Sequence, residues 1–68
     1  MSIGERLKEA RGQKPRADVA KAVGVSVSAI GMYEAGYRVP KDIIKQRLAN
    51  YYGQTVEALF FGDKGHES

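Results

Sequence analysis

The sequence predicts an all-α domain of five short helices. Three observations support this prediction: five segments carry apolar residues at helical spacing, a Ser, Thr or Pro stands at the start of each segment, and a glycine follows each one. No segment shows the strict alternation of apolar and polar residues that is typical of a strand. At 68 residues the chain is long enough for one small domain with a single core.

The first helix is expected to follow Ser2 and to end at Gly12. Ser2 and Glu5 match a capping box, in which the hydroxyl and the carboxylate each accept a hydrogen bond from an amide at the helix start. Ile3 and Leu7 are four residues apart and therefore share one face of this helix, which we expect to be buried.

A second and a third helix are expected over 16–23 and about 27–35. Gly24 allows a tight turn between them, Ser26 supplies a side-chain acceptor for the start of the third helix, and Gly36 stops it. This arrangement predicts a central helix-turn-helix. The small and apolar side chains expected between the two helices are Val19, Ala20, Val23, Val25, Ile30 and Tyr33.

Two further helices are expected, over about 41–52 and over 56–61. The fourth helix follows Pro40, which suits a first helical turn, and the fifth follows Thr55, which can cap it. Phe60 is expected in the core because it falls on the apolar face of the fifth helix.

Charge divides the chain into a basic body and an acidic end. Residues 1–51 hold ten of the eleven Lys and Arg and five acidic residues, a net charge of +5, whereas the remainder carries −2. A basic body favours a polyanionic partner. We expect residues 1–62 to form the domain and residues 63–68 to form a disordered polar tail.

The composition argues against several classes of function. The chain has no cysteine and one histidine, His66 in the polar tail, so thiolate metal sites and disulfides are excluded and no metal or other cofactor is expected. No Ser, His and carboxylate set or phosphate-binding loop is present, so we expect no enzyme. The N-terminus lacks an apolar signal core and no apolar run spans a bilayer, so we expect a cytoplasmic protein with no membrane contact.

The sequence resembles the lambda-repressor-like family, which includes phage repressors, Cro-type regulators and XRE-like bacterial regulators. The resemblance covers about residues 3–61. It rests on the spacing of Ala20, Gly24, Val25, Ser26, Ile30, Glu34, Gly36, Pro40, Leu59 and Phe60. It implies that the third helix enters the major groove of double-stranded DNA, and that two copies read half-sites about 34 Å apart.

The resemblance also implies which residues contact DNA. The expected base contacts are Val27, Ser28 and Met32, with Ala29 and Gly31 nearby. The expected phosphate contacts are Arg16, where the family usually has a Gln, together with Ser26, Tyr37, Arg38 and Lys14. Solvated charge is the alternative role for the basic residues, and Ser26 is expected to cap its helix in either case.

The third helix departs from the family in its exposed side chains. The family often has Gln, Arg or Asn there, which form paired hydrogen bonds with bases, whereas this chain has Val27, Ser28, Gly31 and Met32. We expect Val27 or Met32 to contact thymine methyl groups and Ser28 to bond either base type, with DNA shape supplying further specificity. The alternative is that Val27 and Met32 contact a protein, and that Gly31 is a destabilising residue without function.

A homodimer is expected because a domain this small buries little of its surface. Phe61 cannot point in the same direction as Phe60, so we expect it in a symmetric dimer contact, with Val56 or Tyr52 beside it; packing on the first helix is the alternative.

Taken together, these features predict a dimeric DNA-binding transcriptional regulator. Repression is favoured over activation because no second domain for a ligand or for polymerase is evident. The alternative from another class is an antitoxin or another protein-binding module that uses the same fold.

Overall fold

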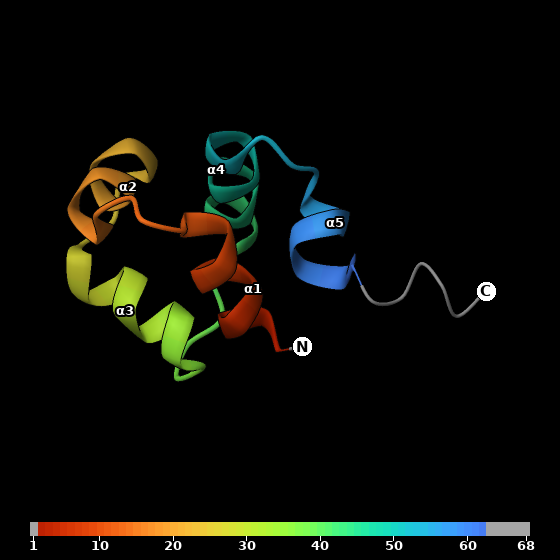
Figure 1. Ribbon diagram of the computed structural model, residues 1–68, viewed down its shortest axis with the longest axis horizontal. Helices are drawn as coiled ribbons and strands as arrows, with labels where there is room; N and C mark the ends of the chain where they lie inside the picture. The colour runs from red at the N-terminus through yellow and green to blue at the C-terminus, as the bar shows by residue number, and fades with distance from the viewer. Residues whose placement is uncertain (1, 63–68) are drawn as a thin grey trace.

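The computed structural model describes residues 2–62, and this part of the chain is folded into five helices with no strand (Figure 1). The helices are α1 (Ile3–Arg11), α2 (Arg16–Val23), α3 (Val27–Ala35), α4 (Asp42–Tyr52) and α5 (Val56–Phe61). The all-α prediction is therefore confirmed, and the helix bounds agree with those expected to within one residue. The predicted tail, residues 63–68, lies outside the described residues, so the division into domain and tail stays a prediction.

Local side chains fix most of the helix starts. The Ser2 hydroxyl accepts from the Glu5 amide at 3.1 Å, and the Glu5 carboxylate accepts from the Ser2 amide at 3.0 Å, so the capping box is present. Ser26 and Thr55 cap α3 and α5 in the same way. The turn between α2 and α3 depends on Gly24, whose φ of +80° is a left-handed conformation that other residues rarely adopt.

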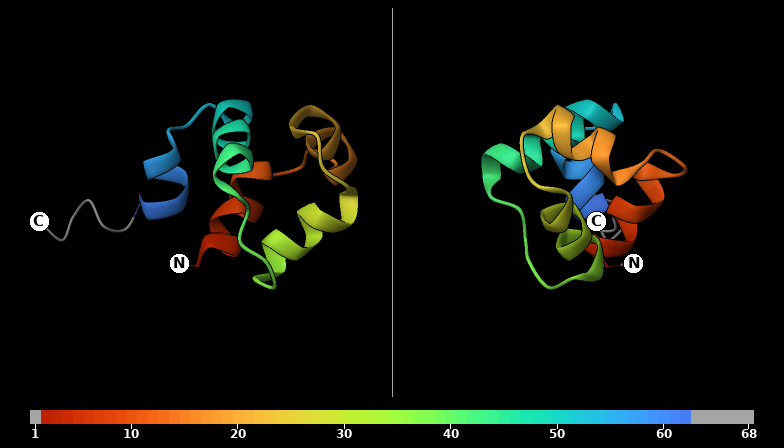
Figure 2. Two further views of the ribbon diagram at one scale, coloured as in Figure 1. Left: turned by 180° about the vertical axis from the view of Figure 1, so that it is seen from behind. Right: turned by 90° about the vertical axis from the view of Figure 1, so that its left-hand side faces the viewer.

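The five helices enclose one core. α1 packs against α3 and α5, α2 packs against α3 and α4, and α4 packs against α5. Figure 2 shows that α2 and α3 form one end of the molecule while α5 lies at the other. The buried apolar side chains come from all five helices: Leu7, Val19, Ala20, Val23, Ala29, Ile30, Tyr33, Leu48, Ala49, Leu59 and Phe60. The predicted burial of Tyr33 and Phe60 is thus confirmed.

The closest approach between two helices occurs at Gly4. A Cβ atom at this position would overlap the backbone carbonyl of Glu34 and would lie 3.0 Å from the carbonyl oxygen of Tyr33. Only a residue without a side chain lets the start of α1 touch the end of α3 in this way. Gly4 therefore sets the position of α3 against the rest of the domain.

We expect Gly4→Ala to lower the free energy of unfolding by about 1–3 kcal/mol, because the added methyl group meets backbone atoms that cannot move aside. Urea unfolding followed by circular dichroism measures the change.

Gly31→Ala is the matched control for this variant. An added Cβ at Gly31 lies 3.7 Å from a terminal nitrogen of Arg16, an ordinary contact distance. This variant should be more stable than the natural protein by up to about 1 kcal/mol, because Ala favours a helix over Gly. Equal effects at the two glycines would contradict the close approach of α1 and α3.

Candidate nucleic-acid interface

The exposed face of α3 carries most of the residues that were expected to contact bases. Val27 is 48% exposed, Met32 is 39% exposed, and Ser28 is also exposed. Gly31 is half-buried. Ala29 corrects the expectation, because its methyl group is buried in the core and its backbone amide bonds the Ser26 hydroxyl. We therefore leave Ala29 out of the candidate interface.

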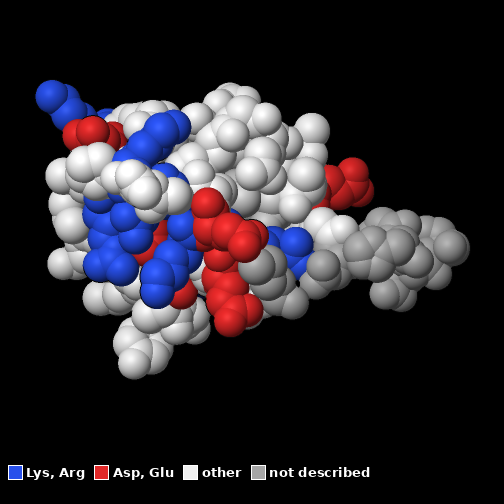
Figure 3. All heavy atoms as spheres, viewed as in Figure 1, with Lys and Arg blue, Asp and Glu red and all other residues white. Residues whose placement is uncertain are grey.

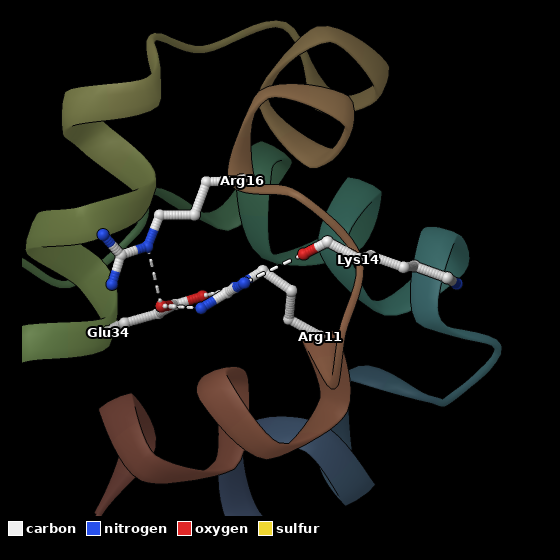
Figure 4. A network of polar contacts seen from close by, with 4 residues as sticks. All are labelled: Arg11, Lys14, Arg16 and Glu34. Atoms are coloured by element: carbon white, nitrogen blue, oxygen red, sulfur yellow. Dashed lines mark hydrogen bonds and ion pairs between the residues drawn. The ribbon is translucent and has the colours of Figure 1, made fainter.

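A buried carboxylate lies behind this face. The side chain of Glu34, at the end of α3, is only 3% exposed, and it accepts hydrogen bonds from two arginines (Figure 4). Arg11 bonds it through both Nε, at 2.6 Å, and Nη2, at 3.1 Å, and this contact raises the pKa of Arg11. Arg16 bonds it through Nε at 3.2 Å. The remaining Arg11 nitrogen, Nη1, donates to the carbonyl of Lys14 at 2.8 Å.

This network joins the end of α1, the connection to α2, the first residue of α2 and the last turn of α3. Because a buried charge is costly unless it is paired, the carboxylate holds all four segments together. Arg11 had no role in the sequence-based prediction, and Glu34 was noted only for its place in the family pattern. A signal for Glu34 was present, since it follows Ile30 by four positions and so falls on the buried face of α3.

Basic side chains gather around the same end of the molecule. Figure 3 shows Lys and Arg side chains grouped where α1, α2 and α3 meet, with acidic side chains lying beside them toward α1. Arg16 remains 44% exposed although it bonds Glu34. Lys14, which was expected to contact phosphate, instead extends away from α3 (Figure 4), and its ammonium lies 5.0 Å from the ring centroid of Tyr51 on α4. The exposed side of this end is therefore positively charged.

The loop after α3 supplies two more of the expected phosphate contacts. Tyr37 is 82% exposed and has no role in the core. Arg38 is also exposed, and its guanidinium lies 5.7 Å from the ring centroid of the buried Tyr33, which holds the arginine near the end of α3. Ser26 has the expected role as a cap.

The expected dimer residues do not share one environment. Phe61 is 40% exposed, and the ammonium of Lys45 lies 5.5 Å from its ring centroid and 5.6 Å from that of Phe60. Val56 is half-buried against the core. Tyr52 instead packs toward α1 and α3, where burial raises its pKa to about 12 and the charge of Glu34 adds to the shift. Phe61 thus remains exposed, whereas Tyr52 belongs to the inner side of α4.

Among residues 2–62, no helix is long and apolar enough to cross a membrane. The same residues contain no group of three His, Cys, Asp or Glu side chains placed to hold a metal ion.

We expect Arg11→Ala to lower the free energy of unfolding by about 3–5 kcal/mol, because it removes two hydrogen bonds from a buried carboxylate. Arg16→Ala is the matched comparison and should cost less than about 1 kcal/mol, because Arg16 is partly exposed and Arg11 still neutralises Glu34. Denaturant unfolding of both variants gives the values. Similar losses would show that Arg11 is not the main partner of Glu34.

The raised pKa of Tyr52 predicts a loss of stability at high pH. In the unfolded chain Tyr52 ionises near pH 10, whereas in the folded protein its pKa is about 12. As the pH rises from about 10 to 12, ionisation therefore favours the unfolded state, and the free energy of unfolding falls. Unfolding of the natural protein and of Tyr52→Phe across this range tests it. The two proteins should differ in the slope of stability against pH, and parallel curves would contradict the assignment.

Comparison with known proteins places this geometry in a family. The sequence matches the helix-turn-helix family model HTH_3 over residues 7–59, which contain all of α2, α3 and α4. No curated protein and no solved structure matches the chain. The match spans most of the chain and includes the tight turn at Gly24 between α2 and α3. The chain therefore belongs to the lambda-repressor-like, or XRE-like, family of DNA-binding helix-turn-helix domains.

Proposed function

We propose that this protein is a transcriptional repressor that binds a two-fold operator as a dimer, with α3 in the major groove. The observation that carries this proposal is the exposed face of α3, which has two exposed arginines beside it: Arg16 of α2 and Arg38 in the loop that follows α3. Cations beside an exposed helix suit the entry of that helix into a groove that is lined by phosphates.

The basic residues supply affinity that does not depend on sequence. Each cation that meets a phosphate releases a condensed counterion, so binding weakens steeply as the salt concentration rises. The start of α2 adds a second kind of group, because Pro15 gives no side-chain cap to the first amides of that helix. Amides at a helix start favour phosphate oxygens.

The exposed side chains of α3 supply selectivity. Val27 and Met32 have the apolar surface to contact thymine methyl groups, and the Ser28 hydroxyl both donates and accepts hydrogen bonds. These contacts distinguish few base pairs by themselves. Operator shape and the spacing of half-sites then add to the selection.

The dimer in this proposal forms around Phe61. An exposed phenylalanine at 40% exposure is favoured in a symmetric contact with its counterpart, with Val56 beside it. The proposal requires that two copies joined in this way place their α3 helices about one turn of DNA apart. A cytoplasmic location and a binding role without catalysis belong to the same proposal.

A protein-binding role is the second candidate, and the apolar surface of the α3 region favours it. Val27, Met32, Tyr37 and Val39 are all exposed, so the surface offers more apolar area than most phosphate-binding sites need. An antitoxin that covers a partner protein with this surface would bind it with little dependence on salt, unlike a DNA-binding protein.

Selection of duplexes from a random pool with the purified protein tests these alternatives. We expect an inverted repeat with half-sites about ten base pairs apart, and affinity that falls by about a factor of 10³ or more between 50 and 200 mM salt if six or more phosphates are contacted. Arg38→Ala should weaken binding to all duplexes and lower the number of phosphates neutralised per operator, read from the salt dependence, by about two, one for each protomer.

A double variant, Val27→Ala with Met32→Ala, separates α3 from the basic residues. It should keep the salt dependence and lose discrimination between the selected site and altered sites. If the natural protein enriches no sequence and its weak binding to duplexes is non-specific, the repressor proposal fails and the protein-binding candidate is favoured.

A further inference from the structure

The middle of the exposed face of α3 has no side chain of its own. Gly31 lies there, between the positions of Ser28 and Met32 along the helix, and its backbone is half-buried. A guanidinium from another helix lies over this position: Nη1 of Arg16 is 3.7 Å from the place where a Cβ of Gly31 would be. The glycine therefore brings a side chain of α2 against the face of α3.

Glu34 fixes how this guanidinium is turned. The carboxylate accepts a hydrogen bond from Nε of Arg16. The two terminal nitrogens of Arg16 have no hydrogen-bond partner within residues 2–62. Figure 4 shows both terminal nitrogens on the side of the guanidinium that faces α3. Arg11 already forms two hydrogen bonds with Glu34 and neutralises most of its charge. The main effect of the bond between Arg16 and Glu34 is therefore to orient the Arg16 guanidinium.

We propose that Arg16 reads a guanine base in the major groove. Its two terminal nitrogens form a planar pair of donors, which matches the O6 and N7 acceptors on the major-groove edge of guanine. This inference rests on the proposed function, since it requires that α3 enter the groove. It differs from a phosphate contact, the role that the family resemblance implies for this position.

The surroundings of Arg16 favour a base over a phosphate. The guanidinium lies against the middle of α3, where its Nη1 is 3.7 Å from the Cβ position of Gly31 on the exposed face. A held arginine also loses less conformational entropy on binding than a free one. Arg16 thereby supplies the paired donor that the side chains of α3 lack.

The test compares affinities for duplexes selected by the natural protein. Each half-site should contain one guanine whose replacement by any other base weakens binding by about tenfold or more. Replacing it by 7-deazaguanine, which lacks the N7 acceptor, should also weaken binding. Arg16→Ala should bind the guanine, the 7-deazaguanine and the substituted duplexes with similar affinities. An unfolding curve confirms that this variant remains folded.

Arg38→Ala is the matched control, because it removes another exposed arginine, in the loop that follows α3. This variant should weaken binding to every duplex by the same factor and keep the preference for guanine. If Arg16→Ala behaves in that same way, or if no guanine is selected, Arg16 is a phosphate contact and the inference is wrong while the repressor proposal stands. If the natural protein selects no sequence at all, the proposed function fails and the inference fails with it.

Discussion

The buried carboxylate of Glu34 is the constraint on which the arrangement of this small domain depends. It is almost fully removed from water, so it has to be neutralised, and the arginine that does this comes from the end of α1. The same oxygens hold the first residue of α2. One charge at the end of α3 thereby fixes the three segments around the candidate nucleic-acid interface, and Gly4 lets α1 come close to α3.

Local residues made the helices predictable. Ser2, Ser26 and Thr55 each bond an amide three residues ahead, and this short-range pattern is visible in the sequence. The bond between Arg11 and Glu34 joins residues 23 positions apart, and no local pattern specifies which arginine is chosen. The close approach at Gly4 was equally hidden, because a glycine in a helix gives no sign of the backbone that it faces.

The candidate interface was predictable in outline and less so in detail. The resemblance to the family implied that Val27 and Met32 face outward from α3, and both are exposed. Ala29 is buried instead, because a resemblance to a family gives a position along the helix, whereas burial depends on how α3 is rotated against α1 and α2. Arg16 was expected to contact phosphate, and its bond to a carboxylate on another helix required the three-dimensional structure.

The position of Lys45 has a consequence for how the protein responds to ionic strength. Its ammonium lies over the rings of both Phe60 and Phe61, so the symmetric contact proposed for Phe61 would bring two like charges toward each other. Added salt would screen that repulsion and favour the proposed dimer, whereas the same salt would weaken the attraction between the basic surface and phosphates. In the proposed repressor, self-association and DNA affinity would therefore change in opposite directions with salt, and occupancy of a two-fold operator would be greatest where the two effects balance.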